Sequence, residues 1–131
     1  MDLLITGSND SIVRLYDMRE SGLKLAKELD GHYKGIKGVT VSYKHKVIIS
    51  CAFDFDILVW NAYLEHPVSR LEGHEAPLIN VCCPLKHDII ISLDSKSVMK
   101  IWNCENYQLI QNFVIFENFP QNTSINFLYK M

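Results

Sequence analysis

Short apolar runs recur along the whole chain, and polar turns separate them. Within many of these runs apolar and polar side chains alternate, as expected for a strand with one face in a protein core. The pattern predicts strands over residues 3–8, 11–17, 36–43, 47–52, 57–61, 68–71, 78–83, 88–93, 98–103 and 109–116. A further extended run covers residues 124–129. The pattern therefore favours an all-β chain.

The same residues return at a fixed spacing. Gly31-His32 and Gly73-His74 lie 42 residues apart, and so do Trp60-Asn61 and Trp102-Asn103. Shifted by 44 residues toward the N-terminus, the central repeat places Thr6, Asp10 and Tyr16 at the positions of Ser50, Asp54 and Trp60. A period of about 40–45 residues indicates a repeat of four-stranded units.

Residues 23–29 are ambiguous from local propensity alone. Leu25, Ala26 and Leu29 share one face of a helix, whereas the repeat places this segment at the outermost strand of a unit. Charged residues such as Lys24 and Lys27 are suited to an exposed sheet edge. We expect the strand.

These features resemble the WD40 repeat, in which four antiparallel strands form one blade of a β-propeller. The Gly-His pair, the alternating strand, the Asp and the closing Trp carry the resemblance. It implies that one set of residues forms a hydrogen-bonded structural tetrad across the central blade: His32, Ser50, Asp54 and Trp60. Such a buried polar network helps to specify one arrangement when every member is satisfied.

The tetrads of the other two blades are expected to be incomplete. The third blade has His74, Ser92 and Trp102, but Lys96 occupies the position of the Asp. Asp94 lies two residues earlier and could substitute only if the turn is rearranged. The first blade has Thr6, Asp10 and Tyr16, with no Gly-His pair before them.

The repeat predicts an incomplete propeller of about three blades. Residues 1–30 form an incomplete first blade, 31–72 the second and 73–117 the third; 118–131 form a linker and the first strand of a further blade. Closed propellers usually contain 4–8 blades. A longer chain or a second copy would supply the remainder, and we favour the longer chain.

Composition removes several classes of function. The net charge of −2 and pI of about 6.2 provide no global field for nucleic acid or an anionic membrane. No apolar run is long enough to span a bilayer, and the N-terminus lacks the pattern of a signal peptide. The four cysteines show no metal-ligand spacing, which is typical of buried thiols in a reducing compartment. We therefore expect a cytoplasmic location.

No catalytic, metal or cofactor motif emerges. His32, Ser50 and Asp54 contain the residue types of a catalytic triad, but the trio recurs with the blade period and Trp60 completes it. The histidines lack zinc-finger spacing, and the glycines lack phosphate-loop spacing. We expect a non-enzymatic protein without a cofactor.

Protein binding is the favoured function, because loops on a rigid scaffold are where recognition residues collect. The candidate partner contacts lie on loops expected at one end of the blades: Lys34, Phe53, Phe55, Glu75 and Pro77. For Phe53, packing under a neighbouring blade remains an equal alternative. The basic residues Lys34, Lys37, Lys44, His45 and Lys46 fall at opposite ends of one strand and cannot form a single phosphate track.

Residues 51–61 (CAFDFDILVWN) and 71–78 (LEGHEAPL) resemble the large WD-repeat proteins of cilia and flagella that also carry an EF-hand region. The resemblance covers about residues 31–116 and implies a scaffold in a microtubule-associated complex of the axoneme. The EF-hand portion is absent from this chain, so no calcium role carries over. The alternative is a cytosolic WD40 adaptor in a regulatory or nucleic-acid-linked complex.

Overall fold

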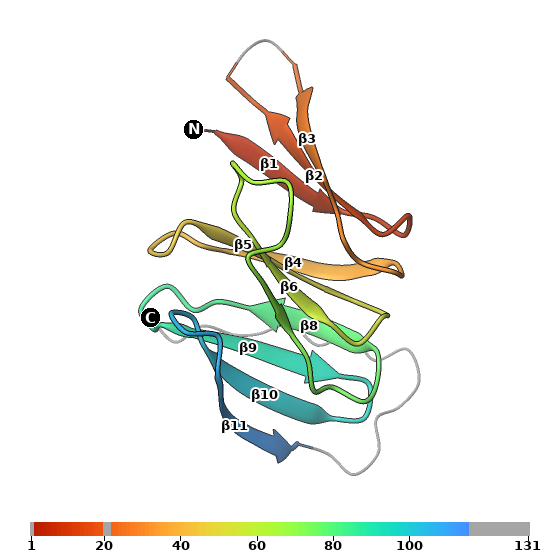
Figure 1. Ribbon diagram of the computed structural model, residues 1–131, viewed down its shortest axis with the longest axis vertical. Helices are drawn as coiled ribbons and strands as arrows, with labels where there is room; N and C mark the ends of the chain where they lie inside the picture. Colours follow the sequence, from red (N-terminus) through yellow and green to blue (C-terminus); the bar gives the residue numbers. More distant parts are fainter. Residues whose placement is uncertain (1, 20–21, 116–131) are drawn as a thin grey trace.

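The computed structural model describes residues 2–19 and 22–115 (Figure 1). Every helix or strand element in these two ranges is a β-strand, which confirms the all-β prediction. None of these residues forms a helix long and apolar enough to cross a membrane. The strand expected over residues 124–129, together with the linker and further blade assigned to 118–131, lies outside the described residues.

The strands form three antiparallel sheets, and each sheet follows the order of the chain. The first contains β1 (Leu3–Gly7), β2 (Ile12–Asp17) and β3 (Lys24–Asp30). The second contains β4 (Ile36–Ser42), β5 (Val47–Ala52), β6 (Ile57–Trp60) and β7 (Ser69–Leu71). The third contains β8 (Leu78–Cys82), β9 (Ile89–Asp94), β10 (Val98–Asn103) and β11 (Leu109–Val114). These are the blades of an incomplete propeller, stacked from top to bottom in Figure 1.

Residues 24–30 form the outermost strand β3 and not a helix. They pair with β2 along its length, from Ile12 opposite Asp30 to Asp17 opposite Lys24. The ladder satisfies the backbone groups of β3 that face β2, and the strand also buries Leu29. Tertiary pairing therefore overrides the local helical propensity.

The innermost strands of the three blades lie against one another, β1 beside β4 and β4 beside β8. Gly7 permits the first of these approaches. A Cβ atom at Gly7 would lie 2.3 Å from Cγ2 of Ile36, so no larger residue fits there without displacing β4. Close packing of the inner strands therefore contributes to the placement of one blade beside the next.

Two apolar cores hold the blades together, one on each side of the central sheet. Side chains of β5 alternate between them: Ile48 and Ala52 pack toward the first blade, whereas Ile49 and Cys51 pack toward the third. All six residues of β5 are buried. The central blade is therefore covered on both faces, as the repeat architecture requires.

The third blade ends in a strand of a different character. All six residues of β11 are exposed, including Ile110 at 55% and Val114 at 63%.

The cysteines belong to the interior. Cys51, Cys82, Cys83 and Cys104 are all buried, and none of them forms a disulfide with another described residue. Thiols in these positions are small apolar packing groups.

Candidate functional site

In the central blade the structure brings His32, Ser50, Asp54 and Trp60 together. His32 precedes β4, Ser50 lies on β5, Asp54 lies in the β5–β6 turn and Trp60 ends β6. His32 Nδ1 lies 2.9 Å from Asp54 Oδ2, and His32 Nε2 lies 2.8 Å from Ser50 Oγ. Trp60 Nε1 donates to Ser50 Oγ at 2.8 Å. The four side chains thus form one continuous chain of hydrogen bonds.

The chemistry of the partners decides how His32 is protonated. A carboxylate can only accept, so Nδ1–H donates to Asp54 and Nε2 accepts the Ser50 hydroxyl proton. Burial lowers the pKa of His32, which favours this neutral ring. Burial alone would raise the pKa of Asp54, but hydrogen bonds from the Tyr33 N–H and the His32 ring outweigh it and hold that pKa below its usual value. The network is a neutral imidazole between a hydroxyl and a carboxylate.

The third blade contains the same network, although we expected it to be incomplete. His74 Nδ1 lies 2.7 Å from Asp94 Oδ2, and His74 Nε2 lies 2.7 Å from Ser92 Oγ. Trp102 Nε1 donates to Ser92 Oγ at 2.9 Å. Lys96, which occupies the repeat position of Asp54, is exposed. The missing carboxylate is therefore supplied by Asp94.

Our condition that the turn must be rearranged was also wrong. Both turns contain a non-glycine residue with positive φ at the same repeat position, Phe55 at 72° and Ser97 at 69°. Asp54 immediately precedes this residue, whereas Asp94 lies three residues before Ser97, at the end of β9. Each aspartate also accepts from turn N–H groups through Oδ1, for example Asp54 from Asp56 N at 3.1 Å. An aspartate at either of two positions in this turn can therefore reach the histidine of its blade.

The first blade has no such network among its described residues. Asp10 accepts two hydrogen bonds from the Arg14 guanidinium, the shorter at 2.5 Å, and one from the Ile12 N–H at 3.2 Å. The Arg14 hydrogen bond is the main reason that the pKa of Asp10 falls to about 2. Thr6 and Tyr16 are only partly buried. The partner of Asp10 is therefore an arginine on β2 and not a buried histidine.

The two complete networks have the connectivity of a Ser-His-Asp triad but not its accessibility. Ser50 and Ser92 are both 0% exposed, and each Oγ also receives a tryptophan N–H. A nucleophile needs a free approach for the substrate and a base ready to take its proton. The geometry supports structural hydrogen bonding, not acyl transfer.

Exposed side chains gather at the end of the blades where these histidine loops lie. We call this surface the turn face and define it by Tyr33, Lys34, Lys37, Phe53, Phe55, Glu75 and Pro77. In each of these two blades one backbone hydrogen bond ties the histidine loop to the turn of the same blade: Phe53 N donates to Gly35 O at 3.0 Å, and Ser95 N donates to Pro77 O at 2.9 Å. The turn face therefore rests on the buried networks.

Aromatic rings and cations pair on this face. Phe53 is 39% exposed, and the Lys37 ammonium lies 5.9 Å from the centre of its ring. Tyr33 is 82% exposed, and the Arg70 guanidinium lies 5.4 Å from its ring centre. Phe55 is 37% exposed. Neither Lys34 nor Lys37 forms an ion pair with another described residue.

Sequence reasoning missed Tyr33, Lys37 and Arg70 as members or neighbours of this surface. Tyr33 directly follows the buried His32, so a signal existed: adjacent residues in an extended segment point in opposite directions. Arg70 gave no such signal, because its partners are distant in the sequence. It pairs with Asp56 and donates to Gly31 O at 3.0 Å.

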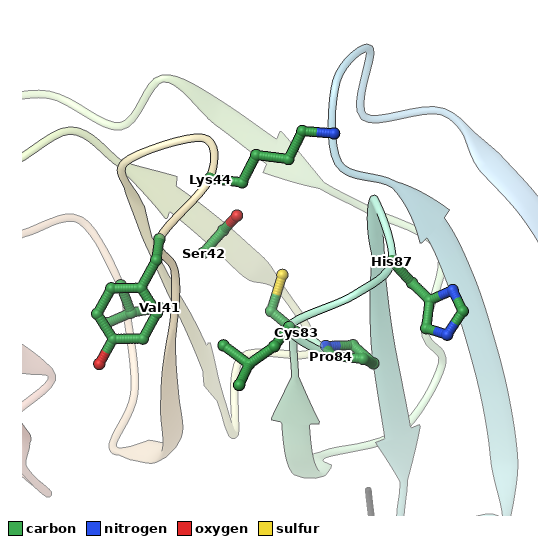
Figure 2. Close-up of a pocket in the computed structure, with 8 residues that line it drawn as sticks. Val41, Ser42, Lys44, Cys83, Pro84 and His87 are labelled. Atoms are coloured by element: carbon green, nitrogen blue, oxygen red, sulfur yellow. The ribbon is translucent and has the colours of Figure 1, made fainter. Parts of the chain in front are cut away.

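The other basic residues of the central blade lie beyond the far end of β4. Lys44 Nζ and His45 Nε2 each lie 2.9 Å from an oxygen of Asp88. Beside them a small pocket is lined by residues of the β4–β5 and β8–β9 turns (Figure 2). In that view the thiol of Cys83 points toward Ser42, and the ring of His87 points away. The basic residues do not form one continuous strip.

Comparison with known proteins identifies the repeat. Residues 23–61 match the family model described as "WD domain, G-beta repeat". This range runs from β3 to the end of β6 and contains all four members of the central network. The matched region therefore contains the whole polar network of the central blade.

Three relatives span different classes of protein. The chain is 24% identical over 116 residues to cilia- and flagella-associated protein 337 B of Tetrahymena thermophila, covering 88% of the chain and 9% of the relative. It is 28% identical over 117 residues to the F-box/WD repeat-containing protein sel-10 of Caenorhabditis elegans, covering 88% and 19%. It is 36% identical over 73 residues to TOPLESS-related protein 2 of Oryza sativa, covering 53% and 6%. The chain spans less than a fifth of each.

Proposed function

We propose that this chain, a member of the WD40-repeat family, is a non-catalytic scaffold whose turn face binds another protein. One observation carries the proposal. Exposed aromatic rings and lysines that form no ion pair with another described residue lie together on or beside loops that two buried hydrogen-bond networks hold in place. Aromatic and cationic side chains on a rigid surface are typical of protein-binding sites.

The networks make the turn face ready for binding. Asp54 Oδ2 accepts from the Tyr33 N–H at 2.9 Å as well as from His32, so one buried carboxylate holds both the network and the loop. The Phe53 N–H is bound to Gly35 O from the opposite side of the same turn. Because the loops are already ordered, a partner need not pay much ordering entropy on binding.

The cellular setting that we propose is a microtubule-associated complex of the ciliary axoneme. Two observations support it: a relative named as a cilia- and flagella-associated protein matches 88% of the chain, and residues 51–61 and 71–78 carry the resemblance described above. The partners would then be other proteins of a large assembly. No membrane or direct nucleic-acid contact is part of this proposal.

The test is capture of partners from a lysate of ciliated cells by the full 131-residue chain. We expect tubulin, dynein or radial-spoke proteins in the captured set, and we expect Tyr33→Ala with Phe55→Ala to deplete them. Tyr63→Ala is the matched control, because Tyr63 is 77% exposed but belongs to the loop after β6. Equal capture by the wild type and the turn-face variant would exclude this face.

A second candidate is a regulatory adaptor outside the cilium. It is favoured by the F-box/WD repeat-containing relative, which matches the same share of the chain at slightly higher identity. The same experiment separates the two. Recovery of ubiquitin-ligase subunits or RNA, without axonemal proteins, would support the adaptor and contradict the axonemal setting.

A further inference from the structure

Three possible metal ligands meet at the end of the blades opposite the turn face. They are His45 from the β4–β5 turn, Asp88 just before β9 and Glu105 just after β10. One ligand atom from each side chain lies within 4.8 Å of the other two. The central blade contributes the imidazole, and the third blade contributes both carboxylates.

The positions of these groups suit a cation. The Asp88 carboxylate already holds one cationic group, the ammonium of Lys44, 2.9 Å from its Oδ2 atom. His45 Nε2 already faces Asp88 Oδ1 at 2.9 Å. With metal–ligand distances of about 2.0–2.1 Å, two ligands of a tetrahedral zinc ion lie roughly 3.3 Å apart. The two ligand atoms therefore need to separate by only roughly 0.4 Å, and the Nε2 proton that now donates to Asp88 is released when the ion binds.

We propose that His45, Asp88 and Glu105 form a binding site for a divalent transition-metal ion, with Zn²⁺ as the best fit and water as the fourth ligand. One imidazole and two carboxylates form a ligand set that zinc accepts, whereas Mg²⁺ and Ca²⁺ prefer oxygen ligands alone. Glu105 is exposed, so its side chain can rotate inward to complete the set. No role for this site follows from the turn-face function.

Lys44 competes with the ion. Its ammonium lies 2.9 Å from Asp88 Oδ2 and is 66% exposed, so it holds the carboxylate by an ion pair that solvent screens. A dication bound to the same carboxylate repels the ammonium, and the long side chain can swing into solvent. Lys44 therefore sets the affinity of the site without being a ligand.

The consequence of metal binding is a link between two blades. His45 is on the turn that closes β4 and β5, and both carboxylates are on the neighbouring sheet. An ion shared by them would oppose separation of the central and third blades, in addition to the apolar core between them. Metal binding to the folded state alone raises stability by mass action.

The test is titration of the full 131-residue chain with Zn²⁺ by calorimetry, paired with thermal unfolding with and without Zn²⁺. We expect one equivalent to bind and the unfolding temperature to rise. His45→Ala should weaken binding by on the order of tenfold or more. His87→Ala is the matched control, because His87 is exposed nearby and is not one of the three ligands.

Lys44→Ala makes the sharper prediction, since it removes the competitor and should tighten Zn²⁺ binding severalfold. Circular dichroism of each variant shows whether the fold is kept. Three results would overturn the proposal: no binding to the wild type, equal loss in His45→Ala and His87→Ala, or weaker binding in Lys44→Ala. None of these results bears on protein binding at the turn face.

Discussion

The central and third blades contain the same hydrogen-bond network but complete it from different places in the sequence. In the central blade the carboxylate comes from Asp54, directly before the residue with positive φ. In the third blade it comes from Asp94, at the end of a strand. The comparison shows that the repeat preserves the position of a carboxylate in space, and not its position in the alignment.

The two blades differ in a second way, at the outer strand. Arg70 of β7 pairs with Asp56 and donates to Gly31 O, so it ties the outer strand to the loop before β4. The strand register places Arg70 opposite Leu58, and it places Asn112 opposite Lys100 at the same position of the third blade. The third blade has no arginine there, and its outer strand β11 is exposed throughout.

The largest expected effect comes from removing the carboxylates. Asp94 is 1% exposed and accepts from His74 and from two turn N–H groups. Asp94→Ala leaves the buried His74 ring and two turn N–H groups without their acceptor, and we expect it to lower the free energy of unfolding by about 2–4 kcal/mol. Asp54→Ala, at a less buried position, should cost about 1–3 kcal/mol. Urea denaturation measures both.

A rescue variant tests whether the two turn positions are interchangeable. Adding Lys96→Asp to Asp94→Ala moves the carboxylate of the third blade to the position that Asp54 occupies. We expect part of the lost stability to return, because Phe55 and Ser97 have similar positive φ angles and equivalent backbone hydrogen bonds tie the two turns to their loops. If the double variant is no more stable than Asp94→Ala, the turns are not equivalent.

Acidification tests the feature that the two blades share. Burial lowers the pKa values of His32 and His74 below the ordinary 6.5, so the unfolded chain takes up protons first as pH falls. Stability should be full above about pH 6.5 and decline below it, by up to about 1.4 kcal/mol per pH unit for each histidine. The lowered pKa of Asp54 changes the pH dependence of stability only below about pH 3.8, the ordinary pKa of an aspartate.

Urea denaturation at about pH 7 and about pH 5 measures this decline. His66→Gln is the control and should leave the decline unchanged, because His66 is exposed in the folded protein as it is in the unfolded chain. A stability that is constant or rises on going from the higher to the lower pH would contradict neutral buried histidines.

A smaller effect is expected at the outer strand of the central blade. Arg70→Ala removes the pairing with Asp56 and the hydrogen bond to Gly31 O, and it should lower the free energy of unfolding by about 1–2 kcal/mol. Arg19→Ala is the matched control, since Arg19 also pairs with an aspartate but its side chain is 61% exposed. Equal effects in a denaturation series would mean that Arg70 contributes no more than a surface ion pair.

The smallest effect should be a gain in stability. Ser97 has a φ of 69°, and its buried Oγ has no hydrogen-bond partner among the described residues. Ser97→Gly removes both penalties and should raise the free energy of unfolding by up to about 1 kcal/mol. Ser11→Gly is the control for the backbone effect. Ser11 has a similar φ of 72°, but its hydroxyl is not among the buried groups that lack a hydrogen-bond partner. A loss of stability in Ser97→Gly would contradict this reasoning.

The repeat made much of the fold predictable. Among the described residues, the apolar pattern placed the strands other than β3 to within a few residues, and the repeat selected strand over helix for residues 23–29, where the structure has β3. The central network was foreseen as well, because its members recur at a fixed spacing. These features depend on local periodicity and on residue identity, which the sequence contains directly.

What the tertiary structure alone decided is which distant side chains meet. Asp94 reaches His74 because a strand end and a loop converge there, although the alignment places Lys96 at that position. His45 Nε2 lies 2.9 Å from Asp88 Oδ1, although the two residues belong to different blades. The physical reason is that period and composition act along the chain, whereas hydrogen bonds and metal ligation depend on distances in space, which only packed sheets define.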